Sequence, residues 1–136
     1  MINLSSVKQI FKPGDRKQTR YVVRPEDVAA FGGEVVHPVC STFTLGREVE
    51  WAGRQFVLEM REAHEEGIGT QLVIDHKAPA FVGEEIVVTA IVDKIESHEL
   101  ICTFEATVNG RIIATGKTGQ KILSREKINR IFTRPS

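Results

Sequence analysis

The chain has 136 residues, of which 41% are hydrophobic, and its formal net charge at pH 7 is 0. The length predicts one domain over residues 1–136, and the balanced charge gives no electrostatic support to a nucleic-acid partner. The two cysteines are too few for a disulfide framework and are predicted to be small buried residues. The polar start at Met1 lacks the apolar segment of a signal peptide, and no apolar run is long enough to span a membrane. We therefore expect a cytoplasmic protein without a membrane partner.

The first predicted elements are short. A turn at residues 12–15 precedes a strand predicted over residues 19–23. Pro25 then favours the start of a short helix, because proline suits the first turn and the acids that follow it suit the positive end of the helix dipole. The glycine pair that begins at Gly32 should end this helix, and residues 34–40 should form an irregular loop.

A long amphipathic helix follows this segment. Ser41 or Thr42 can cap its start. Apolar residues then recur at steps of three and four over more than five turns, namely Leu45, Val49, Ala52, Phe56, Met60 and Ala63. The helix should end by Gly67, and as the longest element it should supply the centre of the core.

The remainder of the chain predicts antiparallel strands. Alternating apolar residues indicate strands over residues 70–76, 85–95, 100–108 and 111–123. Asn109-Gly110 is the strongest hairpin signal, because a type I′ turn needs positive φ at both central positions. A strand, a long helix and about four further strands indicate an α+β fold in which a sheet wraps around the helix.

Three polar side chains stand out from this scaffold: Thr42 at the helix start, Glu50 beside the apolar stripe, and His76 at the end of a strand. A hydroxyl, a carboxylate and an imidazole together could perform acid-base or nucleophilic acyl chemistry. Each also has a structural interpretation. Thr42 could be the helix cap, Glu50 could face solvent, and His76 could bond to a loop.

With this order of elements, these residues resemble the hot-dog fold acyl-CoA thioesterase superfamily, and within it the fluoroacetyl-CoA thioesterase-like branch. The matching positions keep the family's spacing without gaps; they are Ser41, Thr42, Gly46, Glu50, Trp51, Ala52, Gly69, Thr70, His76, Ala78, Gly83 and Glu84. The resemblance implies a curved antiparallel sheet of about five strands around one long helix. It also implies that Thr42, Glu50 and His76 are catalytic, and that Gly69 lies beside the acyl group. The expected assembly is a homodimer with active sites at its interface, and pairing into a dimer of dimers stays open.

The activity implied by the resemblance is hydrolysis of a short or modified acyl-CoA thioester to the acid and free CoA, without cofactor or metal. Glu50 would act as general base or nucleophile, and His76 would protonate the leaving thiolate or orient Glu50 and water. The helix N-terminus at Thr42 could stabilise the oxyanion. Attack by Glu50 and attack by water both fit the sequence.

Four further residues are candidates for substrate binding. Three of them lie in or just after the segment where a fluoroacetate-selective member should carry an aromatic lid, namely Val36, His37 and Phe43. This segment lacks that lid, so the identity of the acyl group stays open. Lys121 belongs to a basic run that begins at Lys117 and could receive an anionic part of the ligand, such as a nucleotide phosphate.

Two other functions fit the same sequence. A non-catalytic acyl-CoA-binding module would reuse this fold with its basic C-terminus. A hot-dog enoyl-CoA hydratase would need an acid and a histidine near the helix start. Glu34 and His37 are the available pair, although their spacing departs from the hydratase pattern.

Overall fold

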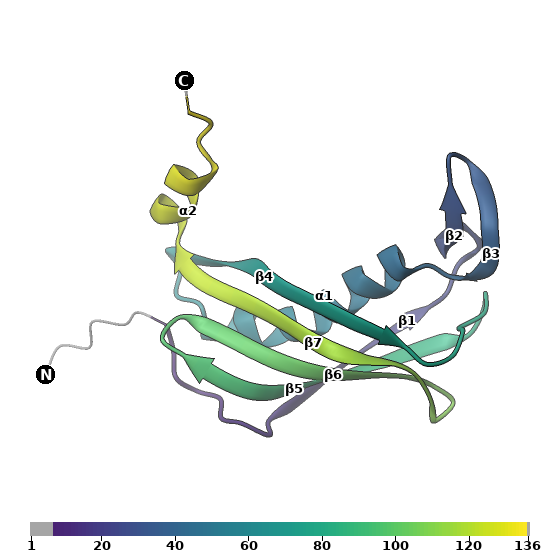
Figure 1. The fold of residues 1–136 in the computed structure, drawn as a ribbon. Helices are drawn as coiled ribbons and strands as arrows, with labels where there is room; N and C mark the ends of the chain where they lie inside the picture. The colour runs from purple at the N-terminus through teal and green to yellow at the C-terminus, as the bar shows by residue number, and fades with distance from the viewer. Residues whose placement is uncertain (1–6, 136) are drawn as a thin grey trace, which may run out of the picture.

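In the computed structural model, which describes residues 7–135, a five-stranded antiparallel sheet curves around one long helix, α1 (Thr42–Met60) (Figure 1). Across the sheet the strands are β1 (Arg16–Val22), β5 (Glu85–Glu96), β6 (Glu99–Val108), β7 (Arg111–Ser124) and β4 (Glu65–His76). This architecture confirms the predicted α+β hot-dog fold. No helix of the described residues is both long and apolar enough to cross a bilayer.

The core lies between α1 and the concave face of the sheet. The predicted helical stripe is buried from Leu45 to Met60, each member being at most 3% exposed, whereas Ala63 lies beyond the end of the helix and is exposed. The predicted alternation is confirmed from Ile86 to Val92 in β5 and from Leu100 to Val108 in β6, where every second residue faces this core. Burial of one large aliphatic or aromatic side chain contributes about 1.5–3 kcal/mol, so this stripe dominates the stability of the fold.

The segment between β1 and α1 corrects two predictions. The helix expected at Pro25 is one 3-10 turn, η1 (Pro25–Asp27), and it leads into strand β2 (Val28–Phe31). The expected loop is strand β3 (Glu34–Cys40), which pairs with β2 as a separate two-stranded sheet. Gly32 and Gly33 have φ values of 59° and 83°, so they form the hairpin turn rather than a helix end. Pro38 is tolerated because a two-stranded ribbon consists only of edge strands.

Asp27 anchors the start of α1. Its buried carboxylate accepts hydrogen bonds from the Tyr21 hydroxyl and from the Arg24 backbone N–H, the latter at 2.8 Å. Its carbonyl accepts a hydrogen bond of 2.8 Å from the N–H of Ser41, and Ser41 Oγ caps the helix by accepting from the N–H of Thr44 at 3.0 Å. Ser41 is therefore the cap, which leaves the hydroxyl of the next residue free for another partner.

We expect Tyr21→Phe to reduce stability more at neutral than at acid pH. Burial raises the pKa of Asp27, but the hydrogen bonds from Tyr21 and Arg24 outweigh it and hold the pKa below its usual value. A carboxyl with a depressed folded-state pKa stabilises the fold above its unfolded pKa, about 3.9, and loses that contribution as pH falls through the folded value. The variant should lose about 1–2 kcal/mol at pH 7 in urea unfolding, and less at about pH 3. An equal loss at both pH values would contradict this link.

A β-bulge interrupts the pairing of β4 with β7. Gly69 pairs with Gln120, but the next paired residue, Gln71, faces Gly119, so Thr70 is an extra residue in β4. A bulge of this kind bends the strand and exchanges the faces to which the following side chains point.

The bulge determines which residues of β4 meet α1. Before it, Gly69 faces Glu50 on the helix; after it, Ile74 lies against Gly46, and His76 reaches the start of the helix. Strict alternation from Gly69 would have turned Asp75, not His76, toward the helix.

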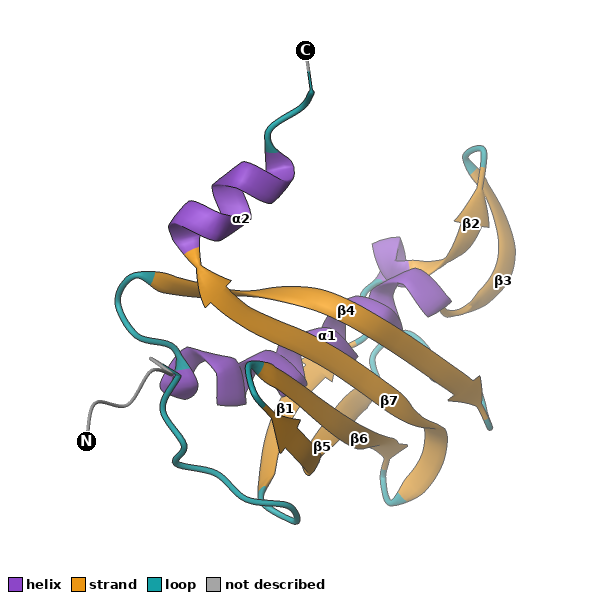
Figure 2. Ribbon diagram, turned by 60° about the vertical axis from the view of Figure 1, so that its left-hand side comes forward, coloured by secondary structure: helices purple, strands orange, loops and turns teal. Residues whose placement is uncertain are grey.

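The C-terminal basic run contains a second helix, α2 (Arg125–Phe132), which points away from the sheet and carries the C-terminus (Figure 2). Ser124 caps it by accepting a hydrogen bond of 3.1 Å from the N–H of Lys127. Ile128 is the one buried residue among its described positions, and Arg125 lies 3.6 Å from Glu66 of β4. The helix therefore meets the sheet only through its first turns.

Candidate active site

The first residue of α1 and the last residue of β4 meet at the open end of the helix. Thr42 Oγ1 and His76 Nε2 share a hydrogen bond of 2.9 Å. The pair forms because Ser41 takes the capping role and because the Thr70 bulge turns His76 toward the helix. Both side chains are exposed in the single chain, so a ligand can reach them.

Glu50 lies about two turns further along α1 and faces the edge strand β4. A Cβ atom added to Gly69 would lie 2.5 Å from Glu50 Oε1, so only glycine leaves room for this carboxylate. The side chain of Gln120 donates a hydrogen bond of 3.4 Å to the backbone carbonyl of Glu50 and so helps to hold this turn. Among the described residues none donates a hydrogen bond to the Glu50 carboxylate, which leaves its oxygens available to water or substrate.

A cavity of about 640 Å³ opens between the β2–β3 hairpin and the start of α1; we call it the hairpin cavity. His37, Thr42, Phe43, Arg24 and Arg47 are among its lining residues. Within the described part of the chain, the backbone N–H groups of Thr42 and Phe43 have no acceptor. Such free N–H groups at a helix N-terminus can bind an anion or a developing oxyanion.

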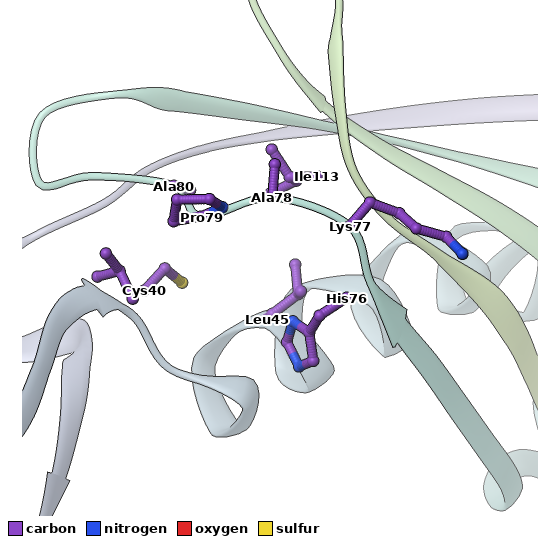
Figure 3. A pocket seen from close by; sticks show the side chains of 9 residues that line it. Cys40, Leu45, His76, Lys77, Ala78, Pro79, Ala80 and Ile113 are labelled. Carbon is purple, nitrogen blue, oxygen red and sulfur yellow. The ribbon is translucent and has the colours of Figure 1, made fainter.

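A second cavity, of about 340 Å³, is lined by His76, whereas the hairpin cavity is lined by Thr42; we call it the His76 cavity (Figure 3). Its walls come from the end of β3, the first turn of α1 and the segment after β4, and they include Cys40, Leu45, His76, Ala78, Ala80 and Ile113. Burial raises the pKa of the Cys40 thiol to about 11, so at neutral pH this residue contributes an uncharged surface. The Thr42–His76 hydrogen bond thus joins a residue of one cavity to a residue of the other.

Of the other predicted binding residues, two line a cavity of the site and two do not. His37 and Phe43 line the hairpin cavity, although Phe43 is 82% exposed in the single chain. Val36 is half exposed on β3 and lines neither cavity. Lys121 projects from the outer face of the sheet, because its neighbour Gln120 is buried toward the helix. The structure therefore does not bring Val36 or Lys121 to the Thr42–His76 pair.

Sequence reasoning missed the residues that complete the two cavities. Arg24 and Arg47 belong to the hairpin cavity, and Cys40 and Ala80 belong to the His76 cavity. Cys40 was predicted only as a small buried residue, and the structure shows it half-buried beside the site. No spacing in the sequence reports these contacts, since each depends on how the hairpin and the segment after β4 fold back onto α1. Within residues 7–135, no group of three His, Cys, Asp or Glu side chains could hold a metal ion.

Gly69→Ala should lower turnover by about 10- to 100-fold. The new Cβ would collide with Glu50 Oε1, which ends a flexible side chain, so the carboxylate would move rather than the backbone. The melting temperature should fall by only a few degrees.

Gly67→Ala is the matched control, because its Cβ would instead lie 2.7 Å from Val57 Cγ1 in the core. That variant should lose more stability and less turnover per folded molecule. Unchanged turnover in Gly69→Ala would show that the position of Glu50 does not matter.

In this chain a curved antiparallel sheet wraps around one long helix, and Thr42 and His76 meet at the open end of that helix. The sequence model of the fluoroacetyl-CoA-specific thioesterase family matches residues 23–126. The chain belongs to this family, and it is a thioester hydrolase.

Solved structures agree with this assignment. A Thermus thermophilus protein, a thioesterase superfamily member, is 32% identical, with a TM-score of 0.87 and coverage of 91% of this chain and 92% of that chain. The fluoroacetyl-CoA thioesterase FlK is 23% identical, with a TM-score of 0.82 over 91% of this chain and 98% of that chain. A hot-dog-like protein from Thermanaerovibrio acidaminovorans has a TM-score of 0.80 at 16% identity, over 92% and 96% of the two chains. A search of curated proteins gave no match.

Proposed function

We propose that this protein hydrolyses a short acyl-CoA thioester, with Thr42, Glu50 and His76 as its catalytic residues. The observation that carries the proposal is the Thr42–His76 hydrogen bond of 2.9 Å at the open end of the helix that also bears Glu50. FlK, which has the same fold, has been seen as one variant with fluoroacetate and CoA and as another variant with acetyl-CoA. That likeness supports a CoA ester as the substrate class.

In the proposed reaction Glu50 accepts a proton from water, whose oxygen attacks the thioester carbonyl. The carbonyl oxygen becomes an oxyanion, which the Thr42 hydroxyl and the free N–H groups at the start of α1 stabilise. When the C–S bond breaks, His76 delivers a proton to the departing thiolate, so the products are a carboxylic acid and free CoA. Direct attack by Glu50 would instead form an anhydride, and water labelled with ¹⁸O would then leave label in Glu50 after a single turnover.

We propose that the working form is a homodimer. Large apolar side chains are exposed around the site in the single chain; they include Phe31 at 77%, Phe43 at 82%, Trp51 at 46% and Leu72 at 48%. The site also adjoins β4, an edge strand whose outer side is unpaired in the single chain. A partner seated there would cover Glu50 and the Thr42–His76 pair. Light scattering over a concentration series would separate a monomer, a dimer and a dimer of dimers.

The free cysteines, Cys40 and Cys102, fit a reducing compartment, and we propose a cytoplasmic location.

For the hydratase alternative, Glu34 follows the hairpin turn and His37 lies further along β3. No hydrogen bond joins this pair among the described residues, so the thioesterase is the function that the geometry favours.

The test is release of free thiol from a panel of CoA esters that includes acetyl-, fluoroacetyl-, butyryl-, hexanoyl-, succinyl- and crotonyl-CoA. Calorimetric binding of the same esters runs alongside. A thioesterase releases thiol with at least one ester. Tight binding without thiol release would indicate a binding module. Loss of the crotonyl double bond without thiol release, abolished in His37→Ala, would indicate a hydratase.

A further inference from the structure

We propose that helix α2 of one protomer packs against the β2–β3 hairpin of its partner and covers the partner's hairpin cavity. The inference rests on the homodimer of the proposed function and not on the reaction that the site performs. Ile128, Ile131 and Phe132 are spaced by three and four residues, so they form one apolar face of α2. Ile128 is buried where α2 meets the sheet, but Ile131 and Phe132 are 53% and 68% exposed. The apolar face of α2 therefore extends past the sheet of its own chain.

Both α2 and the hairpin project past the β4 edge of the sheet, at opposite ends of that strand (Figure 1, Figure 2). α2 starts beside the first residue of β4, because Glu65 pairs with Ser124. The hairpin ends just before Thr42, which is hydrogen-bonded to His76 at the other end of β4. At about 3.3 Å per residue, the 12 residues of β4 span roughly 40 Å, so α2 does not reach the hairpin of its own chain.

A second copy brings these two surfaces together. The two protomers of a homodimer are related by a two-fold axis. An axis through the middle of β4, perpendicular to the sheet, makes the two β4 strands antiparallel and pairs the edge that is open in the single chain. The start of one β4 then lies beside the end of the other. α2 of each protomer therefore projects toward the hairpin of its partner, and the symmetry forms both contacts at once.

The two surfaces are complementary in polarity and in charge. Phe31 of the hairpin is 77% exposed, and Glu34 is its direct partner across the ribbon, so the two side chains share one face. On α2, Lys127 lies one helical turn from Ile131. Within residues 7–135, neither Glu34 nor Lys127 forms an ion pair. An apolar side chain beside a cation on α2 thus matches an aromatic ring beside an anion on the hairpin.

The hairpin cavity lacks a cover in the single chain. Two of the rings that line it, Phe31 and Phe43, are 77% and 82% exposed. Packing of Ile131 and Phe132 against these rings would remove apolar surface from water, which favours the contact. It would also narrow the opening of the cavity beside Thr42. The partner would then supply side chains at the entrance of each site, so binding of a CoA ester would depend on α2.

A disulfide between engineered cysteines tests the contact directly. A chain with Glu34→Cys and Ile131→Cys should become mostly covalent dimer after mild oxidation, because a disulfide needs Cα atoms within about 7 Å. Ile10→Cys with Ile131→Cys is the matched control. Ile10 is 54% exposed, but it follows Lys8, which is hydrogen-bonded to Met60 at the end of α1 away from the hairpin. The control pair should give little covalent dimer, and the wild type shows what the native cysteines contribute.

Phe132→Ser tests the effect of α2 on the site. The variant should raise KM for a CoA ester about tenfold, with a smaller change in kcat, because the partner's hairpin cavity loses its cover. Phe132→Leu, which keeps an apolar side chain, should restore most of the affinity. If no ester is hydrolysed, calorimetric affinities for the same esters give this comparison.

The outcomes separate this contact from the proposed function. A dimer in light scattering that is not crosslinked by the Glu34–Ile131 cysteine pair would overturn the contact and leave the thioesterase function in place. Binding to phosphatidylglycerol vesicles that is lost in Phe132→Ser, without crosslinking, would overturn it in favour of a membrane surface. A crosslinked dimer that releases thiol from no ester would support the contact while the thioesterase function fails. If the first cysteine pair does not fold, Val35→Cys with Phe132→Cys joins the same two surfaces.

Discussion

Glu50→Gln should abolish thiol release while leaving CoA-ester binding nearly intact. A glutamine amide has almost the same shape as the carboxylate and fits beside Gly69, but it cannot accept a proton from water. The loss of a general base lowers turnover by about 10²- to 10⁴-fold, and the loss of a nucleophile would be at least as large. The measurement is kcat by thiol release, with ester affinity measured separately by calorimetry.

Glu59→Gln is the control for this experiment. Glu59 is also on α1, but its carboxylate pairs with Lys17 at the surface, far along the helix from the Thr42–His76 pair. The turnover of the Glu59→Gln variant should stay close to that of the wild type. A Glu50→Gln variant that binds and hydrolyses normally would remove Glu50 from the mechanism.

His76→Ala should lower turnover by about 10²- to 10³-fold for CoA esters, whose leaving thiol is weakly acidic. The substitution removes the proton donor for the thiolate and also the hydrogen bond to Thr42. An aromatic thiolate departs readily without protonation, so the variant should lose much less activity with a thioester of an aromatic thiol. Comparison of kcat/KM for the two leaving groups measures this difference.

His64→Ala is the matched control, since His64 is exposed just after the end of α1 and should not affect either substrate. Equal losses with both leaving groups in His76→Ala would mean that His76 positions Thr42 rather than transferring a proton. Thr42→Ser, which retains a hydroxyl, should then keep more activity than Thr42→Val.

The strands after the helix could be predicted because each carries its own local signal. Apolar residues alternate through β5 and β6, and Asn109 and Gly110 have the positive φ values, 49° and 77°, that their sequence requires. The β2–β3 hairpin could not be predicted in this way. A glycine pair fits both a helix end and a hairpin turn, and tertiary packing decides which one forms.

The candidate site could be predicted only in part from the sequence, for a related reason. Thr42, Glu50 and His76 could be named from residue type and family spacing, but the meeting of Thr42 with His76 depends on pairing between β4 and β7. Lys121 was selected for its charge, whereas its direction follows from strand alternation against Gln120. Charge can be read along the chain, but the face of a sheet is defined only once the register is known.

The bulge at Thr70 makes the chemistry of this protein depend on one irregularity in strand pairing. If Thr70 joined the regular pairing of β4 with β7 and the residue count stayed the same, the Asp75 carboxylate would replace the His76 imidazole at the helix start. Removal of Thr70 would instead leave a regular strand in which His76 still faces the helix, whereas a residue inserted between Gln71 and His76 would turn His76 away. For redesign, the Gly32–Gly33 turn of the hairpin can be lengthened or shortened to change what enters the site, whereas any change in β4 must leave His76 on the side that faces the helix.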